Sequence, residues 1–349
     1  MAWPGRPPRP VRLKVLILKP SSLGDVIHAL PVARLLRLQY PDCEIHWWLG
    51  KDLLPLLADD PDISRLIPFN RRRWWSPTCQ TGLWQTVNAA RKERYDLVID
   101  LQGLMRSALF AWLARGAYTV GVLDRREGGS ALYDLAVERP GKDVHAVDWY
   151  LAVAKAIGLD PSRAIDWLPE NRAVATEVRR KWRVDGARWV VLCPGARWEN
   201  KMWPLNSFVE LSRKLLHEHA DLKLVVIGGR EDMGRGQVLH SAEPDRVLDL
   251  TGCTSLTEMV EWIRLAEVTV TNDTGPMHVA AAMKKPVVAI FGPTAPERTG
   301  PYGQIDRVLR ASLPCVPCLQ RRCHFEEALA CLHRIKPEQA LRQSALFLA

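Results

Sequence analysis

The seven residues from Asn272 to His278 have the composition of an anion-binding site at the start of a helix. They follow an apolar segment and precede a run of small residues. The first turn of a helix has unpaired N–H groups and a dipole that favours negative charge. Thr274 or Asp273 can cap such a helix, and Gly275 lets the backbone approach a ligand closely. A well-capped helix without a ligand would have the same sequence, so other motifs must support this interpretation.

A second set of residues, near the N-terminus, could supply a general base. Lys19, Ser21, Ser22, Gly24 and Asp25 lie between the first apolar segment and an expected helix. Asp25 is the candidate base, and Lys19 is close enough in sequence to keep its carboxylate ionised. The other residues of this set could bind hydroxyl or anionic groups of an acceptor. A first-turn Asp also interacts favourably with the helix dipole, so a purely structural role for Asp25 stays open.

Two loops in the second half of the chain could hold a diphosphate. Residues 194–204 carry Arg197 and Lys201, whose charges complement phosphates, and Pro204 is expected at the first position of a helix. Residues 291–303 are rich in glycine and proline, which fixes a loop of defined shape. The candidate binding residues of this second loop are Gly292, Pro293 and Thr294.

Basic and amide side chains in the first half could contact an acceptor. Gln102 and Arg106 follow an apolar segment that ends at Asp100. The run Arg71–Trp75 is basic and aromatic, and Arg72 within it could bind phosphates or acidic sugars. A solvated surface run is the alternative for this stretch.

Four cysteines are clustered near the C-terminus, with the spacing C-x2-C-x4-C-x7-C. They are Cys315, Cys318, Cys323 and Cys331. The spacing is compatible with a structural zinc or iron–sulfur site, although it is not that of a standard zinc finger. Reduced thiols without a metal, or a disulfide, remain alternatives. The other cysteines, which are Cys43, Cys79, Cys193 and Cys253, are expected to be buried thiols.

Apolar segments of strand length alternate with helical segments along the whole chain. Expected strands occupy residues 12–19, 44–49, 95–100, 118–121, 189–193, 222–227, 268–271 and 287–291, and the first expected helix covers residues 25–38. This alternation predicts an α/β fold of parallel sheets covered by helices on both faces. The pattern weakens between residues 158 and 171, so we expect two doubly wound domains, 1–165 and 172–349. The C-terminal helix could pack back on the first domain.

Composition narrows the range of partners. The chain has 349 residues and a formal net charge of +9, from 48 Lys and Arg against 39 Asp and Glu, which suits an anionic partner. No nucleic-acid motif accompanies the charge. No segment approaches the roughly 18 apolar residues of a membrane span, and residues 1–10 lack a signal-peptide core. We expect a cytoplasmic protein that can contact the inner face of a membrane. The pairs Trp47-Trp48 and Trp74-Trp75 could lie at such an interface, but core positions are commoner.

Taken together, five motifs resemble the bacterial heptosyltransferases of glycosyltransferase family 9, which build the inner core of lipopolysaccharide. The motifs are Lys19–Asp25, Asp100–Leu104, Lys201–Pro204, Asp273–His278 and Phe291–Thr294, in family order and spread over nearly the whole chain. The resemblance implies a GT-B fold, in which two Rossmann-like domains face a central cleft. It also implies an acceptor site on the first domain and a nucleotide-sugar site on the second.

The resemblance further implies an inverting transfer from ADP-L-glycero-β-D-manno-heptose without a metal or other cofactor. Asp25 would take the proton of the acceptor hydroxyl, and Lys201 would neutralise the leaving diphosphate. Asp273 would bind heptose hydroxyls, with Thr274, Gly275, Pro276 and His278 in the same pocket. Pro276 stands where many relatives have an apolar residue such as Leu. The D-x-D match at residues 60–62 is expected to be structural.

Other functions are compatible with the same fold. The donor could be another nucleotide sugar, and the acceptor could be O-antigen or another surface glycan. A sugar-nucleotide epimerase would need additional acid and base carboxylates. A non-catalytic sugar-nucleotide-binding protein would need neither Asp25 nor Lys201.

Overall fold

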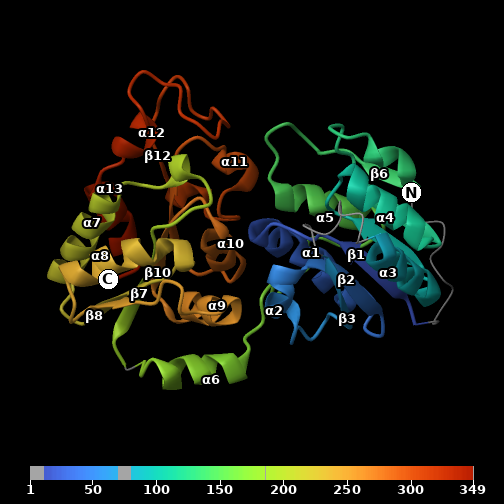
Figure 1. Ribbon diagram of the computed structural model, residues 1–349, viewed down its shortest axis with the longest axis horizontal. Coiled ribbons are helices and arrows are strands. Elements are labelled where there is room, and N and C mark those ends of the chain that lie inside the picture. Colours follow the sequence, from blue (N-terminus) through green and yellow to red (C-terminus); the bar gives the residue numbers. More distant parts are fainter. Residues whose placement is uncertain (1–11, 70–79, 185, 349) are drawn as a thin grey trace. The chain divides into compact units, whose positions relative to one another are not determined.

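The chain folds into two compact units, Met1–Pro169 and Glu170–Ala349. The computed structural model describes residues 12–69, 80–184 and 186–348 (Figure 1). Each unit contains one six-stranded sheet in which all the paired strands are parallel. The predicted α/β class, with two Rossmann-like domains, is confirmed.

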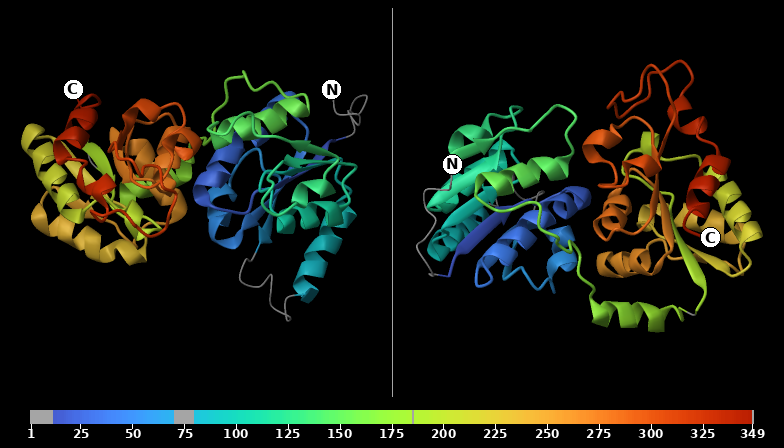
Figure 2. Two further views of the ribbon diagram at one scale, coloured as in Figure 1. Left: turned by 90° about the horizontal axis from the view of Figure 1, so that it is seen from above. Right: turned by 180° about the vertical axis from the view of Figure 1, so that it is seen from behind.

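The first unit is a doubly wound sheet with strand order β3-β2-β1-β4-β5-β6. Helix α1 packs with α5, and α3 packs with α4, so helices cover both faces of the sheet (Figures 1 and 2). Its elements are β1 (Lys14–Leu18), α1 (Leu23–Gln39), β2 (Glu44–Gly50), α2 (Leu54–Leu57), β3 (Arg65–Phe69), α3 (Gln80–Glu93), β4 (Leu97–Asp100), α4 (Met105–Ala114), β5 (Tyr118–Val122), β6 (Leu135–Val137) and α5 (Ala146–Ala156).

The second unit repeats this topology, with strand order β12-β11-β10-β7-β8-β9. Helix α7 packs with α8 and α13, and α9 packs with α10 and α6. Its elements are α6 (Arg172–Lys181), β7 (Arg188–Cys193), α7 (Leu205–Glu218), β8 (Leu222–Val226), α8 (Met233–Ala242), β9 (Val247–Asp249), α9 (Leu256–Leu265), β10 (Val268–Asn272), α10 (Gly275–Ala282), β11 (Val287–Phe291), α11 (Pro296–Thr299), β12 (Val308–Arg310), α12 (Ala330–His333) and α13 (Pro337–Ala345).

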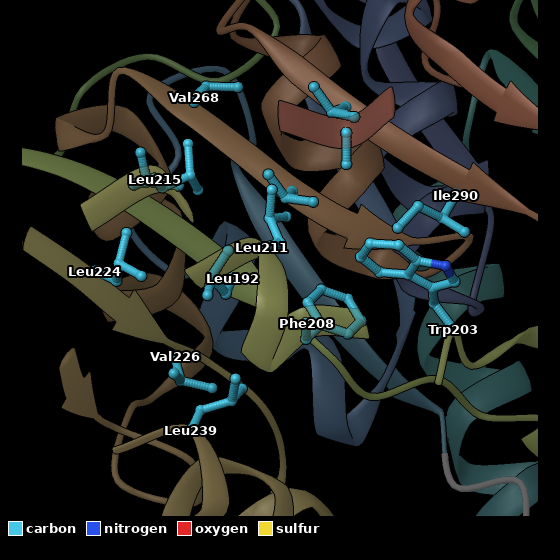
Figure 3. Close-up of a cluster of buried hydrophobic side chains, with 14 of the residues drawn as sticks. Leu192, Trp203, Phe208, Leu211, Leu215, Leu224, Val226, Leu239, Val268 and Ile290 are labelled. Atoms are coloured by element: carbon cyan, nitrogen blue, oxygen red, sulfur yellow. The ribbon is translucent and has the colours of Figure 1, made fainter. Parts of the chain in front are cut away.

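The central strands are buried on both faces because helices cover both sides of a parallel sheet. All five residues of β10 and all five of β11 are buried. Figure 3 shows the core that these strands share with α7 and α8, including Trp203, Phe208 and Ile290. Trp203 belongs to the loop after β7, and its indole Nε1 donates to the carbonyl of Ile335 at 3.0 Å. This buried indole therefore anchors a loop of the candidate site to the core.

Several local predictions can be compared with the structure. Trp47 and Trp48 are buried in β2, so the core interpretation of that pair is confirmed; Trp74 and Trp75 lie outside the described residues. Pro204 was predicted at the first position of a helix, but it is the N-cap residue of α7, which begins one residue later at Leu205. Helix α13 packs on α7, β10 and β11 within the second unit, and a contact with the first unit stays a prediction.

The acidic loop at residues 60–62 has the structural role that was expected for it. Arg34 of α1 is 5% exposed, and its guanidinium donates to Asp60 at 2.6 Å and to Asp62 at 2.7 Å. The same side chain donates to the carbonyl of Trp167 at 2.9 Å. One buried cation therefore ties α1 to the acidic loop and to the last residues of the first unit. Across the described ranges, no helix combines the length and apolarity of a membrane span.

Replacing Arg34 with Met should destabilise the first unit by about 3 kcal/mol, because the buried Asp60 carboxylate loses its partner. Urea unfolding followed by tryptophan fluorescence would measure this change. Arg65→Met is the matched control, since Arg65 pairs with Glu93 through a side chain that is 54% exposed, and it should cost less than about 1 kcal/mol. Equal effects of the two substitutions would contradict the assigned role of Arg34.

Candidate functional site

In each unit the candidate residues lie where the strand order reverses. In open parallel sheets, ligands bind beyond the carboxyl ends of the strands at that reversal. The reversal falls between β1 and β4 in the first unit and between β7 and β10 in the second. The loops that follow these four strands carry most of the residues that the sequence singled out.

Lys19 crosses the reversal point of the first unit. It follows β1, is only 3% exposed, and donates through Nζ to the carbonyl of Leu101, which follows β4, at 2.9 Å. Burial alone would lower the pKa of this ammonium, but the neighbouring Tyr150 and Asp25 outweigh burial and raise the pKa overall. The Lys19 ammonium therefore stays charged at neutral pH.

Asp25 lies in the first turn of α1 and has two kinds of contact. Its Oδ2 accepts hydrogen bonds from the backbone N–H of Ser22 at 2.9 Å and from the Ser22 hydroxyl at 2.8 Å. Its Oδ1 lies 3.7 Å from Lys19 Nζ, and the side chain is 41% exposed. Asp25 therefore has the structural role at the start of the helix that the sequence left open. The same carboxylate is accessible and held next to a fixed positive charge.

The close approach of two loops positions this segment. The N–H of Gly50, at the end of β2, donates to the carbonyl of Pro20 at 2.9 Å. A Cβ atom at residue 50 would lie 2.5 Å from that carbonyl oxygen, so only glycine fits. Gly24 is buried in the first turn of α1, and Ser22 is the exposed N-cap residue.

Ser21, Gln102 and Arg106 border one cavity of about 130 Å³ in the first unit. Trp48 and Phe69 form its apolar wall, with the two rings 4.3 Å apart. Buried Oε1 of Gln102 has no hydrogen-bond partner among the described residues, and it is therefore available to a ligand donor. Arg72, which was expected to bind the same partner, lies outside the described residues.

The sequence placed Asp100 in a motif but assigned no role to its side chain, which shapes this loop. Asp100 is fully buried, and it accepts hydrogen bonds from the backbone N–H of Gln102 at 2.8 Å and from the hydroxyl of Tyr133 at 2.7 Å. Burial raises the pKa of Asp100. The sequence does show an Asp at the end of a buried strand. However, Tyr133 is distant in sequence, so its hydrogen bond to Asp100 could not be predicted.

Asn272 holds the reversal point of the second unit together. Its side chain is completely buried. The amide Nδ2 donates to the carbonyl of Pro194 at 2.9 Å, and Oδ1 accepts from the backbone N–H of Trp203 at 3.0 Å. Both ends of the loop that carries Arg197 and Lys201 are therefore fixed by one amide from β10. The motif was recognised in the sequence, but this positioning role was not.

Lys201, Asp273 and Thr294 meet at one carboxylate oxygen. Lys201 Nζ lies 2.6 Å from Asp273 Oδ2, and the Thr294 hydroxyl donates to the same oxygen at 2.6 Å. Asp273 has a side chain that is 6% exposed, and that of Lys201 is 17% exposed. Three candidates from three separate loops are thus in contact. The ammonium also lies 4.9 Å from the centroid of the Trp198 ring.

Thr274 is the N-cap residue of α10, which begins at Gly275, but its side chain makes no capping hydrogen bond. Thr274 therefore occupies the predicted N-cap position, without a side-chain hydrogen bond to the helix. Asp273, the other candidate, precedes the N-cap residue, and its carboxylate is directed to Lys201 and Thr294. Pro276 and His278 lie in the first turn of the helix, where Pro276 has no N–H to donate.

The remaining donor candidates lie on the flanking loops. Arg197 is exposed, whereas Gly292 and Pro293 are buried. A Cβ atom at residue 292 would lie 3.0 Å from Leu332 Cδ2 and 3.3 Å from the carbonyl of Asn200, so the glycine permits close packing of this loop.

The four clustered cysteines are free thiols, and all of them border one cavity in the second unit. The structure therefore contains no disulfide among them. Of the scattered cysteines, Cys43 and Cys193 are buried as predicted, while Cys253 is exposed. The prediction for Cys253 was wrong because this residue lies in the turn after β9 rather than in a strand. Cys79 lies outside the described residues.

Comparison with known proteins gives a consistent result. Lipopolysaccharide heptosyltransferase 1 of Pseudomonas aeruginosa is 31% identical over 362 residues, covering 97% of this chain and 99% of the relative. Lipopolysaccharide heptosyltransferase 2 of Escherichia coli is 28% identical and covers 85% of this chain and 88% of its own.

Solved structures similar to this chain are also heptosyltransferases. An ADP-heptose LPS heptosyltransferase II from Escherichia coli matches with a TM-score of 0.77 and 26% identity, covering 96% of this chain and 98% of that one. An Escherichia coli heptosyltransferase solved with ADP matches with the same TM-score and identity, covering 97% and 100%.

A family model described as glycosyltransferase family 9 (heptosyltransferase) matches residues 83–329. This range includes the Lys201, Asp273 and Thr294 contacts. Family model, relatives and structures therefore agree with one another and with the motifs of both units. The chain belongs to glycosyltransferase family 9, the heptosyltransferase family.

Proposed function

We propose that this protein transfers a heptose from ADP-L-glycero-β-D-manno-heptose to the inner core of lipopolysaccharide, with Kdo-lipid A or a heptosyl-Kdo glycan as acceptor. The observation that carries the proposal is the contact of Lys201 with Asp273 and Thr294 beside the start of α10. The names of the relatives, which are lipopolysaccharide heptosyltransferases, support the choice of donor and acceptor.

The donor half-site of the second unit is suited to a sugar diphosphate. The Lys201 ammonium and the first-turn N–H groups of α10, including that of Gly275, would balance the charge of the leaving ADP. Because these groups supply positive charge from the protein itself, we propose a transfer that needs no metal. Asp273 would accept hydroxyls of the heptose, and its contact with Thr294 fixes the orientation of its carboxylate.

The acceptor half-site of the first unit is suited to an anionic sugar. Arg106 and the buried amide oxygen of Gln102 border the cavity that would receive it. Asp25 would take the proton from the attacking hydroxyl. Attack by that hydroxyl on the anomeric carbon, opposite the ADP leaving group, gives inversion in a single displacement.

The acceptor lipid implies contact with a membrane surface, and we place that contact on α3 and α4, which lie side by side in Figure 1. The apolar side chains Met105, Leu109 and Trp112 recur at helical spacing on α4 and are 40–56% exposed. Trp84 on α3 is 52% exposed. Exposed Lys92, Arg94 and Arg115 end these helices and complement anionic lipids, as does the net charge of +9. We propose that the protein binds the cytoplasmic face of the inner membrane through this surface.

The direct test is a transfer assay with ADP-heptose and a Kdo-lipid A or heptosyl-Kdo acceptor, with UDP- and GDP-sugars assayed in parallel. Transfer from ADP-heptose is the expected result, and the preferred acceptor identifies the heptose position. Turnover of a different nucleotide sugar, with none from ADP-heptose, would contradict the proposed donor and leave the fold assignment intact.

Asp25→Asn should lower kcat at least about a hundredfold while leaving the Kd for ADP within about twofold. Asparagine retains an oxygen that accepts the Ser22 hydrogen bonds but cannot take a proton at neutral pH. Single-turnover kinetics and calorimetry would measure the two quantities. Ser22→Ala, which removes the hydroxyl contact with Asp25, is the control and should change kcat far less. Turnover of Asp25→Asn within about tenfold of wild type would exclude Asp25 as the base.

Lys201→Ala should weaken ADP binding at least about tenfold and also reduce kcat, because the ammonium would interact with the diphosphate in both ground and transition states. Lys214→Ala is the matched control, since Lys214 pairs with Glu338 at 2.9 Å in the same unit. It should leave both parameters unchanged. An unaltered ADP affinity in Lys201→Ala would remove this residue from the diphosphate site.

The double variant Trp84→Ala/Trp112→Ala should bind vesicles of phosphatidylethanolamine and phosphatidylglycerol about tenfold more weakly, as read by co-sedimentation. Both rings would lose their contact with the lipid interface. Met233→Ala/Val238→Ala removes exposed apolar side chains from α8 instead and should have no effect. Equal losses in the two double variants would argue against α3 and α4 as the membrane-binding surface.

A further inference from the structure

The segment between β12 and α12, residues 311–329, is a long loop without a helix or strand of its own (Figure 1). We call this segment the cysteine loop. It brings Cys315, Cys318 and Cys323 to the rim of a cavity of about 170 Å³, where Cys331 of α12 completes the set. Long irregular segments inside compact domains usually have a functional reason or a cross-link that stabilises them.

The chemistry of the cavity favours a soft metal ion. All four cysteines border this one cavity, and sulfur ligands in this number are those that zinc and iron prefer in closed four-coordinate sites. Cys323 Sγ accepts a hydrogen bond from the backbone N–H of Leu329 at 3.3 Å. Backbone N–H groups directed at sulfur stabilise metal-bound thiolates. The four thiols therefore have the ligand type, number and local hydrogen bonding of a closed tetrathiolate site.

The other candidate ligand cluster in the described residues does not need a metal. Glu44, His46 and Glu93 have ligand atoms within 4.8 Å of one another. However, Lys14 Nζ already pairs with Glu93 at 2.8 Å, and His46 hydrogen-bonds Glu44 at 2.9 Å. These carboxylates thus have cationic or hydrogen-bonding partners from the protein.

The four cysteines border a cavity of about 170 Å³, which is larger than one metal ion. Zn–S bonds of about 2.3 Å would hold sulfur atoms roughly 4 Å apart. Binding of an ion would therefore draw the loop inward and close the cavity.

The cysteine loop is hydrogen-bonded to both loops that carry partners of Asp273. Asn200 Nδ2 donates to the carbonyl of Gln320 at 2.8 Å, and Asn200 precedes Lys201. The N–H of Leu319 donates to the carbonyl of Pro293 at 2.8 Å, and Pro293 precedes Thr294. These two hydrogen bonds connect the cysteine loop to the residues that precede Lys201 and Thr294.

We propose that Cys315, Cys318, Cys323 and Cys331 bind one Zn²⁺ or Fe²⁺ ion, and that this ion rigidifies the donor half-site through Asn200 and Pro293. Each thiol loses its proton to solvent as its sulfur bonds to the metal, with no change of oxidation state. All four positions of the metal are filled by protein, so its role is structural. The effect on the donor half-site rests on the function proposed above, whereas the metal site itself does not.

The first test is metal content. The full chain, purified without immobilised-metal chromatography, should contain about one equivalent of zinc or iron by mass spectrometry. Absorption spectra distinguish the two, because Fe²⁺–thiolate sites absorb in the near ultraviolet and zinc is silent. Cys318→Ser/Cys323→Ser should lose the metal. Cys253→Ser, which changes an exposed thiol of the same unit, should keep it.

Two results would overturn the metal site. One is protein that holds no metal as purified and takes up neither Zn²⁺ nor Fe²⁺ under anaerobic titration, with all four thiols still reactive toward Ellman's reagent. The other is a disulfide between members of the set in freshly prepared protein. If the double variant fails to fold, wild-type protein stripped with a chelator and then reloaded gives the same comparison.

The second test is ADP affinity by calorimetry in metal-loaded, stripped and reloaded wild-type protein. We expect stripping to raise the Kd at least about fivefold and reloading to restore it. An unchanged Kd would overturn the coupling to the donor half-site. Absence of ADP binding in the loaded protein would instead count against the proposed function, because metal stoichiometry is measured independently of any nucleotide.

Discussion

Each half-site depends on one contact, which a largely buried lysine makes across the point where the strand order reverses. Lys19 reaches from the loop after β1 to the carbonyl of Leu101 after β4. Lys201 reaches from the loop after β7 to Asp273 after β10. Burying an ammonium is costly unless it is paired or hydrogen-bonded, so the two loops must stay in register for either contact to persist. The same requirement leaves a fixed positive charge where an anionic ligand would bind.

The loops are held by hydrogen bonds with buried side chains other than the two lysines. Asn272 clamps both ends of the Lys201 loop, and Asp100 holds the backbone of Gln102. Trp203 then secures one end of the Lys201 loop to the core through Ile335. Hydrogen bonds fix the backbone of these loops, and apolar packing holds the side chains that make the hydrogen bonds. The half-sites are therefore organised before a ligand binds. Such preorganisation is what an enzyme that stabilises a charged leaving group requires.

The sequence by itself determined the fold class and most of the candidate residues. Apolar segments of strand length that alternate with helices are buried by parallel sheets that helices cover. Polar motifs at the ends of those segments fall at the carboxyl edge, because in a parallel sheet all the strand ends lie on one side. Asp25, Lys201, Asp273 and Thr294 were therefore identifiable from position and residue type, and so was the structural role of the acidic loop that pairs with Arg34.

Only the tertiary structure decided which of these residues touch. Lys201, Asp273 and Thr294 are far apart in sequence and share one oxygen atom, a contact that depends on the order of β7, β10 and β11. The same contact engages the Asp273 carboxylate, and Thr274 rather than Asp273 is the N-cap residue of α10. The convergence of four thiols beside Asn200 has the same origin. Local sequence determines each helix or strand, with bounds that are accurate to a few residues. Contacts between loops depend instead on the order of the strands in the folded sheet.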